Sequence, residues 1–300
     1  MKRALVTGGT VFVSRSMAEH LVRGGWEVYV LNRGSRRQSS GVRLIRADRH
    51  DAAEALRGLH FDLVVDTAYN AHDVETLLDS LESFDDYVLI SSSAVYPEYL
   101  PQPFREDTPV GPNRFWGQYG ADKIAAEEAL LQRVSGAYVL RPPYLYGPLN
   151  NVYREAFVFD CAAQGRPFFL PGEGSMGLQF LHVRDLCRFV DVLLETRPAQ
   201  RVFNVGNTGL ITVREWVAAC YAAVGTTPEF VCVEEDVEQR SYFSFYDYEY
   251  CLDVSAQHAL MPEETPLAEG LREAWAWYRL HGDEVNRKPL MAFIDSRWPR

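Results

Sequence analysis

The sequence predicts an α/β fold, in which a doubly wound parallel sheet is joined to a smaller C-terminal α/β lobe. Two observations carry this prediction. Short apolar runs that favour strands alternate with segments of helical periodicity through the first half of the chain, and a glycine turn separates the first strand from the first helix. At 300 residues, 47% of them hydrophobic, the chain is long enough for one large core or two unequal lobes.

The elements can be assigned in order along the chain. A strand over Lys2–Thr7 and the turn that begins at Gly8 lead into a helix ending near Arg23. Further strands are expected at Trp26–Leu31, Leu44–Ala47, Phe61–Asp66 and Tyr87–Ser91, with helices over Ala52–Arg57 and Val74–Leu81. We assign residues 1–148 and about 184–208 to the sheet domain, and residues 149–183 and 209–300 to the smaller lobe.

Charge and composition exclude several classes of protein. A formal net charge of −11 disfavours non-specific binding to nucleic acid, because phosphate backbones repel an acidic surface. No apolar run is long enough to span a membrane, and Met1-Lys2-Arg3 leads directly into the first strand, which predicts a cytoplasmic protein without a signal peptide. The five cysteines lack the spacing of metal ligands, so we expect reduced thiols and no metal site.

The stretch from Gln118 to Leu131 is rich in Ala, Glu and Leu and predicts a helix. Tyr119 and Lys123 are four residues apart and therefore share one face of that helix. Only three of the 30 basic residues are lysines, so a lysine at this position is unusual for the chain. A nearby ammonium favours the phenolate and moves the pKa of a tyrosine from ~10 toward neutrality, as a general acid or base requires.

Six segments together resemble a known family. In chain order they are Thr7-Gly8-Gly9, Ser91–Tyr96, Tyr119–Lys123, Arg141–Pro148, Phe180–Leu186 and Phe203–Gly206. They are similar to the extended short-chain dehydrogenase/reductases, the NAD(P)-dependent epimerase/dehydratase family, over nearly the whole chain. The stretch from Tyr146 to Pro167 resembles an atypical branch that includes the plastid stem-loop RNA-binding proteins. The resemblance implies a Rossmann-type sheet domain and a substrate lobe.

The family's glycine turn is altered here. Gly8 and Gly9 are present, but Val11 and Ser14 stand where the second and third family glycines are expected. Because the second glycine lets the backbone approach the pyrophosphate, Val11 predicts weaker or shifted dinucleotide binding. After the second strand, Asn32 and Arg33 replace the acidic residue that would hold the ribose of NAD, which favours NADP; a solvated basic loop is the alternative.

The resemblance also implies the remaining cofactor contacts. Asp48 would meet the adenine, Thr67 and Ala68 the ribose and phosphates, and Pro142 and Tyr144 the nicotinamide. The expected cofactor-binding set is therefore Thr7, Gly8, Gly9, Thr10, Val11, Phe12, Val13, Asn32, Arg33, Asp48, Thr67, Ala68, Tyr119, Lys123, Pro142 and Tyr144.

The catalytic set implied by the resemblance is Ser92, Tyr119 and Lys123, with Ser93 as the neighbour that could be confused with Ser92. Tyr119 would exchange a proton with a substrate oxygen that Ser92 orients, and Lys123 would bind the nicotinamide ribose. Sugar dehydratases of the family place an acidic pair just after the serine, where this chain has Ser93 and Ala94. This difference counts against sugar 4,6-dehydration.

The residues expected to bind substrate are Ser93, Tyr144, Asn150, Gln179 and Arg184. Leu178 replaces an arginine that holds the diphosphate in nucleotide-sugar members of the family, and Tyr144 replaces an asparagine, which weakens the case for a UDP-sugar. The aromatic-dense run Ser241–Tyr250 is interpreted as core, with a stacking platform as the alternative. His182 is interpreted as structural, and Arg184 as a salt-bridge residue at a helix start.

The first hypothesis is an NAD(P)-dependent oxidoreductase or epimerase acting on a hydroxyl or carbonyl of a sugar-like small molecule. Two alternatives stay open: an RNA-binding or RNA-processing protein on the same fold, and a cofactor-bound sensor without chemistry. The resemblance further implies a homodimer through the helix that carries Tyr119, with Ala125, Ala129 and Val74–Leu81 at the seam.

Overall fold

The computed structural model describes residues 1–299, which form two compact units. The first unit contains Met1–Pro143, Val183–Gly206 and Leu252–Glu264, and the second contains the segments between and after them, Tyr144–His182, Asn207–Cys251 and the chain from Thr265 onward. Arg300, the last residue of the predicted lobe, lies outside the described residues. The two units are described separately below.

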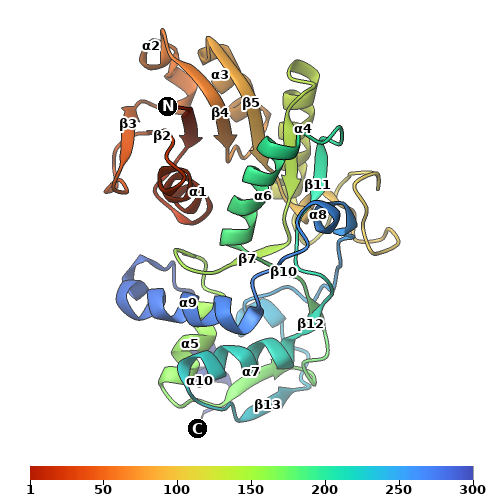
Figure 1. Ribbon diagram of the computed structural model, residues 1–300. Coiled ribbons are helices and arrows are strands. Elements are labelled where there is room, and N and C mark those ends of the chain that lie inside the picture. Colours follow the sequence, from red (N-terminus) through yellow and green to blue (C-terminus); the bar gives the residue numbers. More distant parts are fainter. Residues whose placement is uncertain (300) are drawn as a thin grey trace. The chain divides into compact units, whose positions relative to one another are not determined.

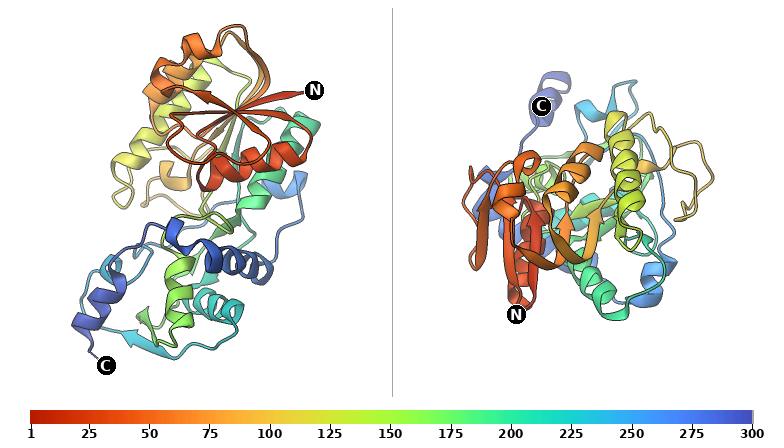
Figure 2. Two further views of the ribbon diagram at one scale, coloured as in Figure 1. Left: turned by 90° about the vertical axis from the view of Figure 1, so that its left-hand side faces the viewer. Right: turned by 90° about the horizontal axis from the view of Figure 1, so that it is seen from above.

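The first unit is built on a seven-stranded sheet whose paired strands all run parallel (Figures 1 and 2). The strand order is β11-β6-β5-β4-β1-β2-β3. This confirms the predicted doubly wound parallel sheet. In chain order the strands are β1 (Arg3–Thr7), β2 (Glu27–Asn32), β3 (Val42–Arg46), β4 (His60–Asp66), β5 (Ser83–Ile90), β6 (Tyr138–Arg141) and β11 (Val202–Asn204).

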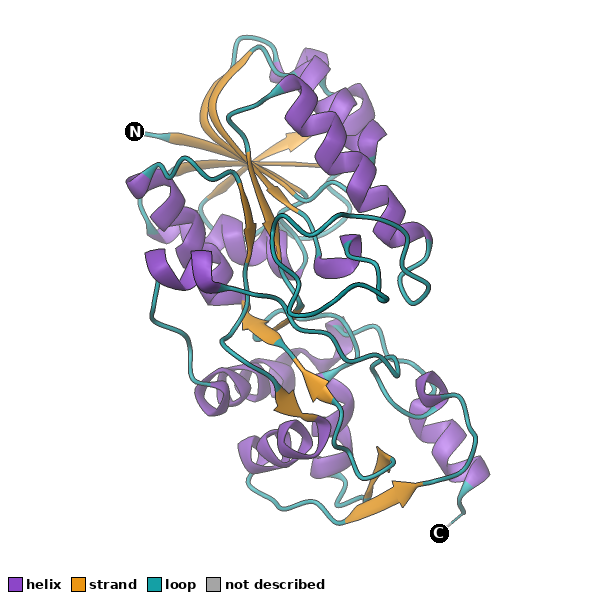
Figure 3. Cartoon of the chain, turned by 90° about the vertical axis from the view of Figure 1, so that its right-hand side faces the viewer, coloured by secondary structure: helices purple, strands orange, loops and turns teal. Residues whose placement is uncertain are grey.

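Helices cover both faces of this sheet (Figure 3). On one face α1 (Phe12–Arg23) contacts α6 (Val183–Thr196), and on the other α3 (Ala71–Ser80) contacts α4 (Gln118–Arg133). The short α2 (Ala53–Leu56) lies beside α3, while α8 (Ser255–Leu260) contacts β11. Two 3₁₀ turns, η1 (Arg49–Asp51) and η2 (Ser93–Val95), follow strands β3 and β5.

The core of the first unit lies between the sheet and these helices. It is made of aliphatic and aromatic side chains from the central strands and the inner faces of α3 and α4, among them Leu5, Phe61, Val64, Leu77, Leu89 and Leu130. β5 begins at Ser83, four residues earlier than the apolar pattern predicted, because three of its first four residues, Ser83, Asp85 and Asp86, are polar and interrupt that pattern.

The second unit is smaller and mixed in structure. Its helices are α5 (Glu155–Ala163), α7 (Val213–Val224), α9 (Leu267–His281) and α10 (Leu290–Arg297), with the 3₁₀ turns η3 (Gln239–Ser241) and η4 (Gly282–Glu284). Three two-stranded sheets join them: β10 (Phe180–His182) with β7 (Tyr144–Tyr146), β12 (Ile211–Thr212) with β9 (Gly177–Leu178), and β13 (Phe230–Val233) with β8 (Phe168–Pro171).

Aromatic side chains fill the core of the second unit. Phe245 contacts Trp216 and Phe180, with ring centroids 5.1 Å and 5.9 Å away. Five aromatic members of the run Ser241–Tyr250 are buried, namely Tyr242, Phe243, Phe245, Tyr248 and Tyr250. The interpretation of this run as core is confirmed, while Tyr246 is only half-buried.

The predicted domain assignment differs from the two units in two places: residues 144–148 belong to the second unit, and residues 252–264 to the first. Hydrogen bonds explain the placement of residues 252–264: Asn204 donates to the carbonyl of Asp253 at 3.3 Å, and Gln257 accepts from the amide of Gly206 at 2.6 Å. Within residues 1–299, no helix has the length and apolarity needed to cross a membrane.

A buried ion pair connects α4 to the sheet. Arg141 at the end of β6 donates to both carboxylate oxygens of Glu127, with Nη2 2.6 Å from Oε2 and Nε 3.0 Å from Oε1. The hydroxyl of Ser91 also donates to Glu127, and Arg141 donates to the hydroxyl of Tyr96 at 2.8 Å. Burial opposes the charge on Arg141, but the bonds to Glu127 outweigh that effect and raise the pKa of the guanidinium.

Replacing Glu127 with Gln should therefore lower the free energy of unfolding by about 3–5 kcal/mol, because it leaves a buried guanidinium without a counter-charge. Urea unfolding measures this loss. The matched control is Asp79→Asn, which breaks the exposed pair between α3 and Arg133 of α4 and should cost less than about 1 kcal/mol. Equal losses of unfolding free energy in the two variants would show that the buried Glu127–Arg141 pair stabilises the fold no more than an exposed ion pair does.

Candidate functional site

The turn between β1 and α1 has a backbone suited to a pyrophosphate. Gly8 and Gly9 have φ of 83° and 75°, in the left-handed region that favours glycine. A Cβ on Gly9 would lie 2.4 Å from Cγ1 of Val30, so no larger residue fits. α1 then begins without an acidic residue in its first turn, and the N–H groups of a helix start attract anions. The residues of this turn fit a dinucleotide.

The two substituted positions are accommodated within this turn. Val11 is the N-cap of α1 with an extended backbone, and its carbonyl accepts from the hydroxyl of Ser14 at 3.0 Å. Phe12 has a φ of 33°, an uncommon value for a residue with a side chain, while Thr10 and Val13 are half-buried. The weakened binding expected from Val11 stays a prediction.

Asn32 connects the end of β2 to the glycine turn. Its amide nitrogen donates to the carbonyl of Gly8 at 2.6 Å and to Oε1 of Gln38 at 3.0 Å, while its oxygen accepts from the amide of Gly34 at 2.8 Å. Arg33 is exposed beside it. The structure thus gives Asn32 a role in shaping this loop that the sequence pattern did not reveal.

Two other predicted cofactor residues are joined through the ends of neighbouring strands. The hydroxyl of Thr7 accepts from the amide of Thr67 at 2.9 Å and donates to Oδ1 of Asp66 at 2.7 Å. Asp48, by contrast, is exposed and caps η1 by accepting from the amide of His50 at 3.1 Å. The carboxyl ends of β1 and β4 therefore meet at the edge where ligands bind in open parallel sheets.

Asp66 and Arg49 are residues at this edge that sequence reasoning missed. Asp66 is fully buried and accepts from Thr7, from the hydroxyl of Tyr87 at 2.6 Å and from Nη2 of Arg49 at 3.0 Å. The same nitrogen of Arg49 donates to the carbonyl of Asp73 at 2.9 Å. The position of Asp66 at a strand end was a usable signal, whereas the reach of Arg49 depends on the packing of η1 against α3.

Lys123 lies buried at the same edge. Its ammonium donates to the carbonyl of Ala68 at 2.7 Å and to the carbonyl of Ile90 at 2.9 Å. An ammonium has three N–H donors, so one remains for another oxygen. Burial lowers the pKa of Lys123 to about 8, although Asp66, Glu127 and Asp73 act in the opposite direction.

Tyr119 lies over this ammonium. Nζ of Lys123 is 5.9 Å from the ring centroid of Tyr119 and 5.5 Å from that of Tyr69. The two tyrosine rings meet edge to face with centroids 6.1 Å apart, and Tyr119 is 38% exposed. The phenol is therefore next to a buried cation and still accessible, which is the arrangement expected from the four-residue spacing.

Ser92 follows β5 two residues after Ile90, whose carbonyl binds Lys123. Its hydroxyl accepts from the amide of Ala94 at 3.2 Å and caps η2. Gly120 allows the start of α4 to approach η2, because a Cβ at that position would lie only 2.5 Å from the carbonyl oxygen of Ala94. Strand end, 3₁₀ turn and helix start thus bring the segments of Ser92, Tyr119 and Lys123 to one edge of the first unit.

The predicted substrate residues are divided between the two units. Ser93 and Arg184 belong to the first unit, and Ser93 is buried with its amide bonded to the carbonyl of Pro142 at 2.9 Å. Tyr144, Asn150 and Gln179 belong to the second unit and are also buried.

The side chains of Asn150 and Gln179 already bond within the second unit. Asn150 donates to Glu155 at 2.9 Å, and Gln179 donates to the carbonyl of Asn207 at 2.9 Å. His182 is buried with its ring 5.0 Å from that of Tyr146, and Leu178, in place of the expected arginine, is buried in β9. These contacts give Asn150 and Gln179 a role in shaping the unit, and their contact with substrate stays a prediction.

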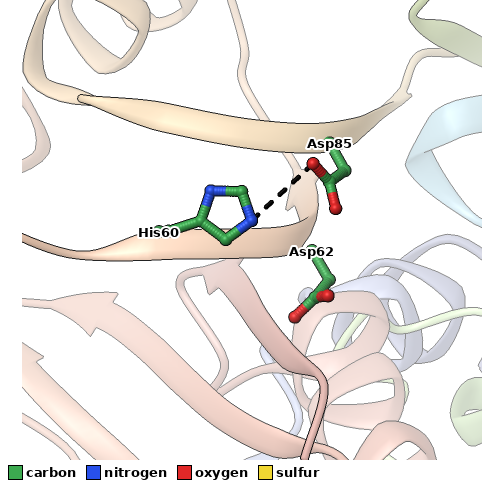
Figure 4. A group of neighbouring side chains, drawn as sticks. All are labelled: His60, Asp62 and Asp85. Carbon is green, nitrogen blue, oxygen red and sulfur yellow. Dashed lines mark ion pairs between the residues drawn. The ribbon is translucent and has the colours of Figure 1, made fainter.

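A separate polar group lies at the opposite edge of the sheet, where β1, β4 and β5 begin (Figure 4). Potential ligand atoms of His60, Asp62 and Asp85 lie within 4.8 Å of one another. Asp62 already accepts from the amide of Arg3 at 2.6 Å, and His60 meets Ser83 at 2.9 Å and Asp85 at 3.7 Å. We assign no metal to this group, because its polar atoms bond within the chain and it is remote from the ligand-binding edge.

Comparison with known proteins gives one family and several relatives. The model of the NAD dependent epimerase/dehydratase family matches residues 4–88 and 70–206. The chloroplast stem-loop binding protein of 41 kDa b from Arabidopsis thaliana is 30% identical over 301 residues, covering 91% of this chain and 78% of that protein.

Solved structures share the fold. The dTDP-glucose 4,6-dehydratase from Bacillus anthracis in complex with NAD has a TM-score of 0.74 and 20% identity, covering 97% of this chain and 100% of that one. The UDP-glucose 4-epimerase from Thermotoga maritima, solved with UDP-glucose, also has a TM-score of 0.74 and 20% identity, covering 93% and 99%. At 20% sequence identity, the similarity to these two structures establishes the fold of this chain.

Replacing Gly120 with Ala should destabilise the first unit by about 1–3 kcal/mol, because a methyl group must displace α4 from the backbone of η2. Urea unfolding of the purified protein measures the change. Gly136→Ala is the control, since its Cβ would meet nothing within 4 Å, and it should change stability by less than about 0.5 kcal/mol. An unchanged midpoint for Gly120→Ala would mean that the close approach does not constrain the helix.

Proposed function

Because the chain belongs to the NAD dependent epimerase/dehydratase family of enzymes, we propose that it is an NAD(P)-dependent oxidoreductase or epimerase. Its substrate is a sugar-like metabolite that reacts at a hydroxyl or carbonyl group. The observation that carries this proposal is the buried ammonium of Lys123, held by Ala68 and Ile90 with the accessible ring of Tyr119 5.9 Å away. A phenol next to a cation suits proton transfer at neutral pH.

Each residue of the candidate site would have a separate role in the reaction. A bound nicotinamide would supply the hydride chemistry, since no side chain can. Tyr119 takes the proton from a substrate hydroxyl or returns it to a carbonyl, and the hydroxyl of Ser92 orients the same oxygen. Lys123 favours the phenolate through its charge and offers its remaining N–H to a ribose hydroxyl. The glycine turn and the start of α1 would hold the pyrophosphate.

The relatives support a sugar-type substrate. Solved proteins of the same fold are named as acting on dTDP-glucose and UDP-glucose. Ser93 and Ala94 occupy the places where a dehydratase needs acidic side chains, so we favour redox chemistry or epimerisation over dehydration.

Tyr119→Phe tests the proton-transfer role directly. Turnover should fall by about 10²–10⁴-fold, the usual contribution of a general acid or base, while cofactor affinity stays the same. The measurement follows nicotinamide absorbance with a panel of free and nucleotide-linked sugars. Tyr99→Phe, at an exposed tyrosine of the same unit, should retain full turnover. If the Tyr119→Phe variant kept the turnover of the wild type, Tyr119 could not be the general acid or base.

We further propose that NADP is the preferred cofactor. Support comes from Asn32, which places an amide and no carboxylate at the end of β2, and from the exposed guanidinium of Arg33 beside it. A 2′-phosphate would be repelled by an acidic residue at this position and attracted by a guanidinium.

Calorimetric titration with NADPH and NADH checks this preference. NADPH should bind more tightly than NADH. Arg33→Ala should weaken the binding of NADPH about tenfold, as expected for one lost charge-assisted bond, without changing the affinity for NADH. Arg57→Ala removes an exposed arginine of the same unit and should alter neither. A wild-type preference for NADH would overturn the choice of NADP but not of a nicotinamide cofactor.

A second candidate function rests on the plant relative, whose name describes stem-loop binding. Its 30% identity over 91% of this chain favours an RNA-binding role on the same fold. The net charge of −11 argues against it, because RNA binding depends on cationic contacts to phosphates. Salt-dependent binding of a stem-loop RNA by this protein would favour the second candidate.

The cytoplasmic location and the homodimer through α4 remain part of the proposal. Four side chains of the predicted seam, Val74, Leu77, Leu78 and Ala129, are buried in the core of their own unit. A dimer would have to use the outer face of α4, where Ala121 and Glu128 are exposed. Sedimentation of the purified protein would show whether this face is used.

A further inference from the structure

Tyr69 keeps a large aromatic ring outside the core of the first unit. It follows β4 directly after Ala68, and 64% of the residue is exposed. Aromatic side chains stabilise a fold mainly by burying their area, so a ring with this exposure adds little to the core. Its place at the ligand-binding edge of the sheet therefore needs a reason other than packing.

The backbone on both sides of this ring is held by hydrogen bonds. The carbonyl of Ala68 accepts from the ammonium of Lys123 at 2.7 Å, and the amide of Tyr69 donates to Oδ2 of Asp73 at 2.8 Å. Asn70 caps α3 by accepting from the amide of Asp73 at 2.9 Å, and Asp73 itself is buried. These bonds fix the backbone of residues 68–70, so the exposed ring moves only about its own side-chain bonds.

The ring of Tyr69 contacts both members of the tyrosine–lysine pair. Its centroid is 5.5 Å from Nζ of Lys123, a distance at which a cation is attracted to a ring face. It meets the ring of Tyr119 edge to face, with centroids 6.1 Å apart and an interplanar angle of 65°. Because Nζ of Lys123 is also 5.9 Å from the ring centroid of Tyr119, the three groups form a closed triangle of contacts.

Tyr119 lies at a point of α4 where a side chain has considerable freedom. It is the second residue of the helix, and the N-cap Gly117 has no side chain that could cover it. The ring of Tyr119 is 38% exposed. The attraction between a phenolate and an ammonium falls with distance and with the entry of water between them. A neighbouring ring that holds the phenol in place therefore affects how readily the phenol ionises.

We propose that Tyr69 is a positioning residue, which holds the ring of Tyr119 close to the ammonium of Lys123 and keeps water from that contact. The edge-to-face contact and the contact with the cation both need the ring of Tyr69 and not its hydroxyl. Phenylalanine should therefore replace Tyr69, whereas leucine, which is apolar but has no ring, should not. This inference rests on the proposed function, because it gives Tyr69 a role in the ionisation of the proposed general acid or base.

The ionisation of Tyr119 can be measured on the whole chain without any substrate. Phenolate and phenol differ in ultraviolet absorbance, and subtracting the titration of the same chain with Tyr119→Phe leaves the signal of Tyr119. Tyr69→Leu should raise the midpoint by about half a pH unit or more, about a threefold change in the ionisation constant, because the ammonium then stabilises the phenolate less. Tyr69→Phe should keep the midpoint of the wild type.

The ammonium titrates in the same range as the phenol can. The pKa of Lys123 is lowered to about 8 by burial, so the phenol and the ammonium ionise as a coupled pair and the shift between variants measures their coupling. The other charges that act on Lys123 come from β4, α3, α4 and η1, and all of them are unchanged in the Tyr69 variants; they are Asp66, Asp73, Glu127 and Arg49.

Turnover gives a second readout, measured by nicotinamide absorbance with the panel of free and nucleotide-linked sugars. Tyr69→Leu should lower kcat about threefold to tenfold at neutral pH, because a smaller fraction of Tyr119 is ionised. Cofactor affinity in calorimetry should change less than about twofold, since the variant acts on the phenol. In a chain that already carries Tyr119→Phe, adding Tyr69→Leu should lower turnover no further.

Tyr99→Leu is the matched control, because Tyr99 is a tyrosine of the same unit that is 75% exposed. It should change neither the midpoint of Tyr119 nor kcat. Near-ultraviolet circular dichroism and urea unfolding check the fold of each variant. Because the ring of Tyr69 is mostly exposed, Tyr69→Leu should unfold near the wild-type urea concentration.

Three results would overturn the inference. An unchanged Tyr119 midpoint in Tyr69→Leu would show that the ring does not hold the phenol, and an equal shift in Tyr69→Phe would assign the effect to the hydroxyl. A further fall in turnover when Tyr69→Leu is added to Tyr119→Phe would make Tyr69 a contact of the substrate instead. Failure of the proposed function looks different, because the wild type would then bind neither NADPH nor NADH while the midpoint of Tyr119 still depended on Tyr69.

Discussion

The burial of one ammonium group determines the structure of the candidate active site. Lys123 bonds to the carbonyls of Ala68 and Ile90, which lie after β4 and at the end of β5, so one side chain joins α4 to two neighbouring strands. Burying a charge is costly unless other groups compensate for it. The carboxylates of Asp66, Glu127 and Asp73 supply part of that compensation, and Arg49 opposes it. The acidic residues around the site therefore offset part of the effect of burial, which lowers the pKa of Lys123 to about 8.

The position of α4 follows from three points along one face of the helix. Gly120 touches the backbone of η2, Lys123 bonds to two strand ends, and Glu127 pairs with Arg141 of β6. These positions are three and four residues apart, so they lie on the same side of a helix with 3.6 residues per turn. Tyr119 precedes the first of them, and its ring is therefore held at the start of a helix that is fixed along its length. Fixing the helix in this way reduces the freedom of the phenol before any ligand binds.

Local patterns predicted the parts of the molecule that depend on neighbours in sequence. The strand, glycine turn and helix at the N-terminus, and the shared face of Tyr119 and Lys123, follow from spacing alone. Arg49 and Asp66 are 17 residues apart and meet only because η1 and the end of β4 reach the same edge of the sheet. The partners of Glu127 come from β6 and from the end of β5. The segment 252–264 returns to the first unit through hydrogen bonds to Asn204 and Gly206 and an ion pair between Glu263 and Arg188. Such contacts are set by topology, and no periodicity in the sequence records them.

Because the chain is acidic, the positions that lack carboxylate groups are informative. A protein with a net charge of −11 repels anions in general, so binding an anionic ligand requires places from which carboxylates are excluded. The first turn of α1 is one such place, since it contains no acidic residue, and the end of β2 carries the amide of Asn32 in place of a carboxylate. A phosphate is repelled by a surface that is negative overall, so its binding depends on such positions, where the local charge does not oppose it.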